Sequence, residues 1–287
     1  MKVVYPNLFP DDPALKLNFE SLDTSDSDNI ILHIDPRNDF EREPNKKYYC
    51  LDFELPNGFL VGKNDYINFY EKNYDKIFTI CPYTVKKRNK ALGKELYQYV
   101  YFPSNSNWNR INEKDIDVIY VGSGSEFILD DSILKFNYRV INKFGGQYNT
   151  DMDINFNDKL NLISRSKISI VHNLLNINSF NLSNNESDFF EIRNKVVGFN
   201  SLTQHKSRVF ESARCRTLLL CKEDDFNIIE DFFEPNVDFL YYNKNNLGEK
   251  IQHILDNYNE YQYMIENAFL KVSNNYDINN FYKNYIL

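Results

Sequence analysis

The stretch Ser207–Leu220, which reads SRVFESARCRTLLL, decides the expected fold. It begins with a polar helix start that carries Arg208 and Glu211, passes through small residues, and ends in the apolar run Leu218–Leu220. A helix that leads directly into a buried strand is typical of parallel α/β folds, in which ligands bind at the carboxyl edge of the sheet. The charged side chains at the start of this helix are therefore candidate ligand-binding groups.

Short apolar runs alternate with helical segments along the rest of the chain. The expected strands cover residues 30–35, 48–54, 76–81, 97–102, 116–121, 138–142, 167–171, 217–221 and 237–242. Several of these runs end at proline or glycine, and helices are expected at 66–74 and 86–95. Strands that alternate with helices predict parallel sheets. The predicted fold class is α/β, with two Rossmann-like domains whose parallel sheets face a central cleft.

A polar segment separates the two halves of this pattern. Residues 104–114 (SNSNWNRINEK) show no hydrophobic periodicity, which is typical of a domain boundary. The 287 residues of the chain leave room for two modest domains. We expect a small N-terminal α/β domain at 1–104, a linker at 105–114, a second Rossmann-like domain at 115–275 and a C-terminal helix at 276–287.

The charge balance is acidic, with 33 Lys and Arg against 41 Asp and Glu and a net charge of -8. Such a surface does not attract a polyanion, so nucleic-acid binding is disfavoured. No apolar run approaches the ~18 residues of a membrane span, and from the N-terminal residues we expect no secretory signal. We therefore expect a cytoplasmic protein without an integral membrane segment. The abundance of Asn, Lys, Ile, Tyr and Phe fits an AT-rich genome, either of a bacterium or of a virus that replicates in host-cell cytoplasm.

The four cysteines stand far apart in the sequence, at Cys50, Cys81, Cys215 and Cys221. None of them forms a Cys-x-x-Cys pair, so we expect reduced, buried thiols. Zinc ligands need closer clustering of Cys and His than this. The run 151–153 has the form Asp-x-Asp, but no apolar strand directly precedes it, and we expect no metal site there.

A Gly/Ser turn follows the expected strand at 116–121. Gly122, Ser123 and Gly124 could present backbone N–H groups to a phosphate, although such turns also occur without a ligand. A dinucleotide-binding Gly-x-Gly-x-x-Gly motif needs a third glycine, where this chain has Phe127. A Rossmann oxidoreductase is therefore disfavoured.

The segment from about residue 167 to 285 resembles the CgeB-like branch of the GT-B glycosyltransferases. Arg208–Ala213 resembles the Arg-x-Phe-Glu-x-x-Ala motif of that family, with Ala213 one residue closer to Glu211 than the motif has it. The other matching features are the strand 167–173, the run 218–220, the helix 247–254, and the turn residues Glu230, Phe233, Pro235 and Asn236. Two residues depart from the family, because Arg216 and Asn236 stand where glycine is usual. Asn tolerates a left-handed turn better than most residues do.

The resemblance implies a glycosyltransferase that moves a hexosyl or related sugar in glycan biosynthesis. The donor would be a nucleotide-sugar, such as a UDP- or GDP-sugar, bound by the domain at 115–275. The acceptor would be a sugar, a lipid or a protein. The resemblance also implies that the reaction needs neither a cofactor nor a metal ion.

The resemblance further implies a donor site at the carboxyl edge of the second sheet. Glu211 would accept hydrogen bonds from the ribose hydroxyls, and Arg208 would contact the diphosphate. His205 and Lys206 would place positive charge on the leaving diphosphate in place of a metal ion. The full expected set is Gly122, Ser123, Gly124, His172, Asn173, His205, Lys206, Arg208, Glu211 and Arg216. Structural alternatives remain open, such as a surface pair between Arg208 and Glu211, or a buried His172.

The first domain would supply the base that accepts the proton of the acceptor hydroxyl. Asp35, Asp52 and Glu54 lie at or near strand ends and are candidates, with solvated carboxylates as the alternative. Two other functions stay open. One is a catalytically degenerate scaffold that acts as a binding or structural protein, and the other is a different α/β enzyme.

Overall fold

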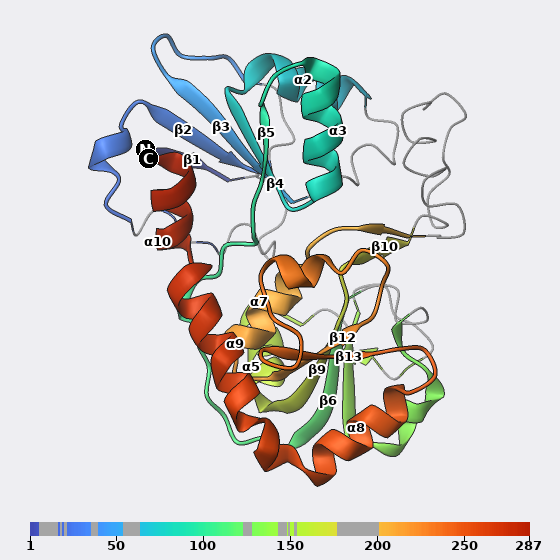
Figure 1. Cartoon of the computed structure of the whole chain (residues 1–287). Coiled ribbons are helices and arrows are strands. Elements are labelled where there is room, and N and C mark those ends of the chain that lie inside the picture. The colour runs from blue at the N-terminus through green and yellow to red at the C-terminus, as the bar shows by residue number, and fades with distance from the viewer. Residues whose placement is uncertain are drawn as a thin grey trace. The chain divides into compact units, whose positions relative to one another are not determined.

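The computed structural model describes the chain except residues 6–16, 18, 20–21, 36–39, 54–63, 123–127, 143–147, 149, 152–153 and 177–200. The chain folds into two compact units (Figure 1). Unit 1 contains residues 1–101, 174–204 and 282–287, and unit 2 contains residues 102–173 and 205–281. Both chain ends thus belong to unit 1, where the Tyr282 hydroxyl lies 2.7 Å from Ser27 Oγ.

Unit 1 is built on a parallel five-stranded sheet in the order β1-β2-β3-β4-β5. The strands are β1 Lys2–Val4, β2 Ile30–Ile34, β3 Lys47–Asp52, β4 Lys76–Thr79 and β5 Tyr97–Tyr99, and the helices are α2 Asn64–Asn73 and α3 Pro82–Leu92. Strands β2 and β3 are almost wholly buried, which is typical of parallel sheets covered on both faces.

Helix α3 begins four residues earlier than the sequence pattern predicts. Pro82 stops strand β4, as expected, but it also occupies the first turn of the helix, where its missing N–H costs nothing. The helix ends at Gly93, which adopts the left-handed conformation at φ 63°. Proline and glycine therefore set both limits of α3.

Unit 2 is built on a parallel six-stranded sheet in the order β13-β12-β9-β6-β7-β8. The strands are β6 Ile116–Val121, β7 Tyr138–Ile141, β8 Thr150–Asp151, β9 Ser166–Val171, β12 Leu218–Lys222 and β13 Phe239–Tyr242. The chain runs outward from β6 to β8 and then returns to place β9 on the other side of β6. The strand order reverses between β6 and β9, and ligands bind at such switch points in open α/β sheets.

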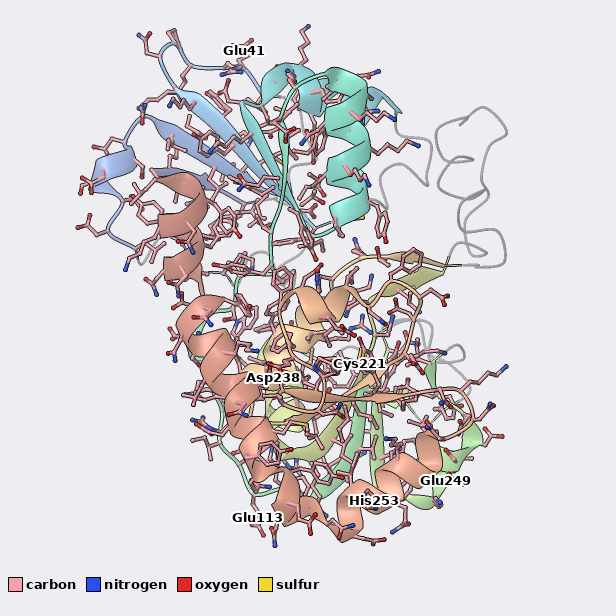
Figure 2. All side chains as sticks on the ribbon, in the orientation of Figure 1. Glu41, Glu113, Cys221, Asp238, Glu249 and His253 are labelled. Carbon is pink, nitrogen blue, oxygen red and sulfur yellow. The ribbon has the colours of Figure 1, made fainter. Side chains whose placement is uncertain are left out.

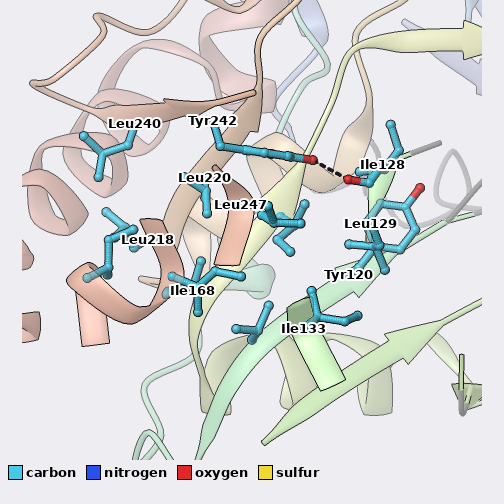
Figure 3. Close-up of a cluster of buried hydrophobic side chains, with 14 of the residues drawn as sticks. Tyr120, Ile128, Leu129, Ile133, Ile168, Leu218, Leu220, Leu240, Tyr242 and Leu247 are labelled. Atoms are coloured by element: carbon cyan, nitrogen blue, oxygen red, sulfur yellow. Dashed lines mark hydrogen bonds between the residues drawn. The ribbon is translucent and has the colours of Figure 1, made fainter. Parts of the chain in front are cut away.

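One face of the unit 2 sheet packs against helix α8 (Leu247–Asp256). Alternate residues of neighbouring strands point to this face, where the Tyr242 hydroxyl donates a hydrogen bond of 2.9 Å to the carbonyl of Ile128 (Figure 3). The buried side chains on this face include Val118, Tyr120, Ile168, Ile170, Leu218, Leu220, Leu240, Leu247, Ile251 and Ile254. Unit 2 also contains the helices α5 Phe156–Arg165, α7 Ser207–Arg214 and α9 Gln262–Asn275, and α7 packs against the other two.

Strand β13 begins at Phe239, later than predicted, because the preceding residues form a turn. Asn236 adopts a left-handed φ of 62°, as its replacement of glycine predicts. Asp238, labelled in Figure 2, accepts a 2.7 Å hydrogen bond from the Glu234 N–H and pairs with Lys271. This carboxylate closes the turn instead of extending the strand.

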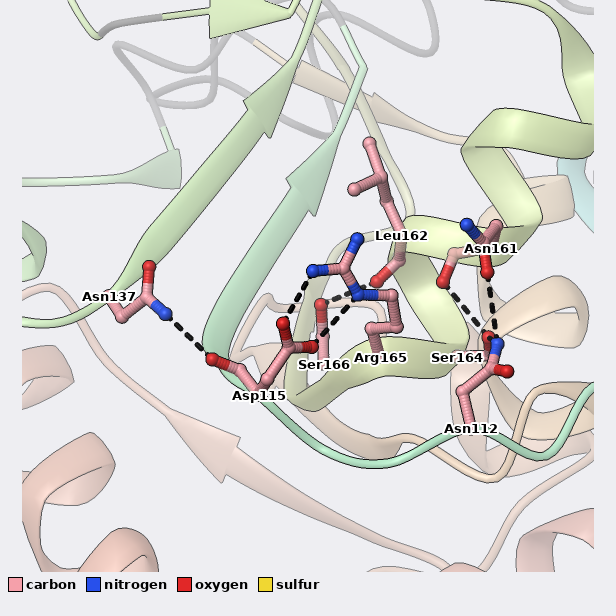
Figure 4. Close-up of polar contacts among 8 residues, drawn as sticks. All are labelled: Asn112, Asp115, Asn137, Asn161, Leu162, Ser164, Arg165 and Ser166. Carbon is pink, nitrogen blue, oxygen red and sulfur yellow. Dashed lines mark hydrogen bonds and ion pairs between the residues drawn. The ribbon is translucent and has the colours of Figure 1, made fainter.

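The residues expected to form a linker are part of unit 2. Trp108 is buried, and polar contacts hold the following segment to α5 (Figure 4). Asp115 pairs with Arg165, and Asn112 donates a 3.0 Å hydrogen bond to Asn161 Oδ1. The hydrogen bond that the Arg165 guanidinium donates to Asp115 lowers the pKa of Asp115.

The strands expected from apolar runs are all present, whereas four short strands carried no signal. These are β1, β8 and the antiparallel pair β10 (Leu174–Asn176) and β11 (Ser201–Thr203). Residues 174–204 belong to unit 1, although they lie within the second domain expected from the sequence. The expected C-terminal helix is divided between the units, with α10 (Ile278–Phe281) in unit 2 and a π-helical turn at Tyr282–Ile286 in unit 1.

Helix α8 approaches Ser132 so closely that its second residue must be glycine. A Cβ at Gly248 would lie 2.5 Å from the Ser132 Cβ. Gly248→Ala should therefore lower the free energy of unfolding by about 1–3 kcal/mol, despite the better helix propensity of alanine. The effect can be measured by urea unfolding. Because Ser132→Gly removes the clashing atoms, the double variant should regain most of this loss, and an unchanged or higher stability of Gly248→Ala alone would contradict the close approach.

Candidate functional site

The switch point of unit 2 brings together residues from two neighbouring strands and one helix. Gly122 follows β6, His172 follows β9, and Arg208 lies in the first turn of α7. The carboxyl ends of β6 and β9 lie at the same edge of the sheet because the two strands are parallel neighbours. Sequence and fold therefore place three of the predicted site residues at the position where ligands bind in this class of sheet.

Arg208 lies against the side chains of Tyr120 and His172. Its Nη1 is 3.2 Å from His172 Nε2 and 3.4 Å from the Tyr120 hydroxyl, and its Cζ lies 5.7 Å from the centre of the Tyr120 ring. The Tyr120 hydroxyl is also 3.1 Å from His172 Nε2, and the two rings stack at an interplanar angle of 19°. Both rings are buried, whereas Arg208 is half-buried. Tyr120 was not among the residues predicted from sequence, because its apolar strand context indicates only a core position.

Gly122 leaves space for the guanidinium. A Cβ at this position would lie 2.1 Å from Arg208 Nη1, and Gly122 has a φ of 137°, which side chains rarely allow. Glycine is thus needed here for close approach to Arg208. Ser123 and Gly124, predicted with it as phosphate-binding residues, lie outside the described residues.

A hydrogen bond joins Asn173, just after β9, to Lys206 at the start of α7. The Asn173 side-chain oxygen accepts a 3.2 Å hydrogen bond from the Lys206 N–H, and Asn173 is fully buried. Lys206 is the N-cap residue of α7 and is half-buried. The helix therefore points its positively polarised N-terminus at the same sheet edge as Arg208.

His205 does not carry the positive charge that was expected of it. Its ring is buried against Phe232, at a centroid distance of 4.7 Å, and Phe210. Burial lowers the pKa of His205 from 6.5 to about 3, and a hydrogen bond with the Ile228 backbone offsets only part of this shift. The imidazole is neutral at physiological pH, so Lys206 and Arg208 remain as the cationic residues of the predicted donor set at this edge.

The buried His205 should make the protein less stable in acid. Above pH 6.5 its imidazole is neutral in both states, but between pH 6.5 and about 3 the unfolded chain binds a proton that the folded chain does not. The free energy of unfolding should therefore fall by up to about 1.4 kcal/mol per pH unit in this window. Urea unfolding of the wild type and His205→Gln between pH 7.5 and 4.5 measures this term. A pH dependence as steep in the variant as in the wild type would show that His205 does not cause it.

Glu211 is fully buried and forms an ion pair with Lys159 of α5. The Lys159 Nζ lies 2.9 Å from Oε2 and 3.0 Å from Oε1 of Glu211, and 4.3 Å from the centre of the Phe156 ring. Glu211 and Arg208 thus have separate partners, and the alternative of a surface pair between them is wrong. Lys159 stands 52 residues before Glu211, and no sequence signal joins the two.

Arg216 lies at the other end of α7, before the amino end of β12, and the structure does not bring it to the Arg208 cluster. Its Nε is 2.9 Å from Glu266 Oε2, and its Cζ lies 3.3 Å from the centre of the Phe269 ring. Arg216 has a φ of 49°, the left-handed conformation for which glycine is usual. Its side chain contacts α9 and does not serve as the predicted ligand of the donor.

The two described base candidates lie at the carboxyl edge of the unit 1 sheet. Asp52 ends β3, and Asp35 directly follows β2 with a left-handed φ of 42°. The pairing of Ile34 with Leu51 places these two carboxylates on neighbouring strands. Both side chains are buried, so the alternative of solvated carboxylates is wrong for this pair. Glu54 lies outside the described residues.

All four cysteines are free and buried, as the sequence predicts. Cys221, labelled in Figure 2, lies within β12. Among the described residues, no three His, Cys, Asp or Glu side chains come together in a group that could hold a metal ion. No helix in the described part of the chain is long and apolar enough to cross a membrane.

Comparisons with known proteins agree with this architecture. A family model described as glycosyl transferase-like matches residues 126–286. The fold is similar to that of Anabaena Alr3699/HepE in complex with UDP and glucose, with a TM-score of 0.56 and 9% identity over 89% of this chain and 76% of that one. Sucrose-phosphate synthase from Thermosynechococcus elongatus gives a TM-score of 0.53 and 8% identity over 87% and 70% of the two chains. A glycosyltransferase from Rickettsia africae gives a TM-score of 0.53 and 12% identity over 90% of this chain and 75% of that one. No curated protein sequence matches the chain.

Proposed function

The chain belongs to the glycosyl transferase-like family, and on this premise we propose that it moves a hexosyl or related sugar from a nucleotide-sugar donor to an acceptor. The observation that carries the proposal is the position of Arg208 at the switch point of a GT-B-type sheet. HepE, which shares this fold, binds UDP and UDP-glucose, and this supports a nucleoside diphosphate sugar as the donor class.

The proposed reaction breaks the bond between the sugar C1 and the diphosphate and forms a bond from C1 to an acceptor oxygen. The electron pair of the broken bond leaves with the diphosphate. Arg208, Lys206 and the N-terminus of α7 supply positive charge at one sheet edge, where they would stabilise this leaving group. We propose that these groups make a metal ion unnecessary.

The acceptor hydroxyl loses its proton to a base. Asp35 and Asp52 are our candidates in unit 1, because both are buried carboxylates at the carboxyl ends of adjacent parallel strands, the edge where ligands bind in α/β sheets. Glu54 stays a sequence-based candidate beside them. We propose a glycan, a lipid or a protein as the acceptor and the cytoplasm as the place of the reaction.

An arginine in place of the usual glycine at position 216 would favour a catalytically degenerate scaffold if its side chain closed the pocket. Because Arg216 contacts Glu266 and Phe269 at the far end of α7, it does not fill the space around Arg208. Arg216 therefore gives no support to the degenerate scaffold.

Donor turnover tests the proposal directly. The protein is incubated with UDP-, GDP- and ADP-sugars, in EDTA or in Mn²⁺, and with water or simple glycosides as acceptors. The release of nucleoside diphosphate is measured. We expect release from the donors of one base, at the same rate in EDTA and in Mn²⁺. Binding of a nucleoside diphosphate without any release would favour the degenerate scaffold, and release that requires Mn²⁺ would contradict metal independence.

A further inference from the structure

The contact between Arg208 and His172 fixes the protonation of the imidazole. A guanidinium carries a permanent positive charge and has only donors. Its Nη1 lies 3.2 Å from His172 Nε2, so Nε2 must act as the acceptor in this hydrogen bond. His172 is consequently neutral, with its ring proton on Nδ1.

Tyr120 forms a cluster of three side chains with Arg208 and His172. Its hydroxyl can accept from Arg208 Nη1 at 3.4 Å, and it lies 3.1 Å from His172 Nε2. Tyr120 lies in β6, and His172 directly follows the adjacent strand β9. The two residues are only 1% and 5% exposed, and their stacked rings restrict each other. Two rigid side chains therefore hold one nitrogen of a half-buried guanidinium.

The backbone at Gly122 lies directly against the guanidinium, because a Cβ at this position would overlap with it. Within the described part of the chain, Nε and Nη2 of Arg208 make no hydrogen bond. These donors can therefore serve a ligand, while Nη1 is used to fix the orientation. An orientation that is set before binding costs less entropy when the ligand arrives.

We propose that His172 is a positioning residue that holds Arg208 in the orientation that receives the diphosphate of the donor. This inference rests on the proposed function, because it assigns a role to His172 in the same site. His172 acts through Arg208 and does not itself contact the ligand. It follows that the contribution of His172 to binding must vanish when the guanidinium is removed.

A double-mutant cycle tests this coupling. The Kd values of UDP, GDP and ADP are measured by calorimetry for the wild type, His172→Ala, Arg208→Ala and the double variant, with thermal unfolding as the check on folding. For the nucleotide that binds, we expect His172→Ala to raise the Kd about 5- to 10-fold in the wild-type background and less than twofold in the Arg208→Ala background. His172→Gln should stay within about twofold of the wild type, because its side-chain carbonyl can accept from the guanidinium.

The other possible results of this cycle contradict different parts of the proposal. An equal loss from His172→Ala in both backgrounds, or an equal loss from His172→Ala and His172→Gln, would overturn the positioning role. A wild-type Kd that His172→Ala leaves unchanged while Arg208→Ala raises it would overturn this inference alone. A wild type that binds none of UDP, GDP and ADP would overturn the proposed function and the inference together.

Discussion

Arg208→Ala is expected to raise the Kd of the nucleoside diphosphate about 10- to 100-fold. Hydrogen bonds to charged groups contribute about 1.5–3 kcal/mol each, and this change removes the guanidinium at the switch point. The fold should not suffer, since Arg208 is half-buried and its side chain contacts Tyr120 and His172 without an acidic partner in the described residues. Calorimetric titration with UDP and GDP measures the effect.

Two control variants make this result specific. Arg208→Lys keeps the charge but loses the planar fork of donors, so its Kd should lie between those of the wild type and Arg208→Ala. Arg216→Ala removes an equal charge from the other end of the same helix, where the side chain contacts α9, and should leave the Kd within about twofold. Equal effects of Arg208→Ala and Arg216→Ala would show that only net charge matters, which contradicts a site at the switch point.

Lys159→Met is expected to lower the free energy of unfolding by about 3–5 kcal/mol. The change leaves the Glu211 carboxylate buried without its cation, and an uncompensated buried charge is strongly destabilising. For a domain of this size, the loss should lower Tm by roughly 6–20 °C. Thermal and urea unfolding measure both quantities.

The double variant Lys159→Met with Glu211→Gln is the matched control. It removes both charges, and neutral replacement of a buried ion pair is often tolerated, so most of the stability should return. Glu211→Ala alone should cost less than Lys159→Met, because the Lys159 side chain is 14% exposed and its ammonium can turn to water. A Lys159→Met protein as stable as the wild type would mean that Glu211 does not depend on this pair.

The same variants bear on the role of Glu211 in binding. The sequence resemblance predicts that Glu211→Ala weakens nucleotide binding and leaves the fold intact. The pair with Lys159 gives Glu211 a structural partner, so a loss of affinity has to be separated from a loss of stability. Nucleotide affinity measured well below the Tm of each variant keeps the two effects apart, and an unchanged Kd would remove Glu211 from the site.

The sheets could be predicted from sequence because local chemistry determines them. Apolar runs that end at proline or glycine mark most strands, and the order of helix and strand around Arg208 indicates its place at the carboxyl edge. Strands of two or three residues, such as β8 and β10, are too short to show an apolar run or an alternation of apolar and polar residues. The assignment of residues 174–204 to unit 1 depends on tertiary contacts that no local pattern encodes.

The site could be predicted only in part, for a related reason. The residue type and helix position of Arg208 suggest an anion ligand, but its orientation depends on Tyr120, which reads as an ordinary core residue. The buried environment of His205 comes from Phe232, a residue 27 positions later, so its neutral state could not be foreseen. Arg216 is close to Arg208 in sequence, yet the length of α7 carries it to the opposite edge of the sheet.

The most direct test of the central claim is a thermal-shift screen of the wild type and Arg208→Ala with UDP, GDP, ADP and CMP, each in EDTA and in Mn²⁺. A ligand at about 100 times its Kd stabilises the folded state by about 2.7 kcal/mol, which gives a clear rise in Tm. We predict that one nucleoside diphosphate raises the Tm of the wild type equally in EDTA and Mn²⁺, and that the same concentration shifts the variant much less. The absence of any shift at millimolar nucleotide, or an equal shift of both proteins, would contradict a nucleotide-sugar site built around Arg208.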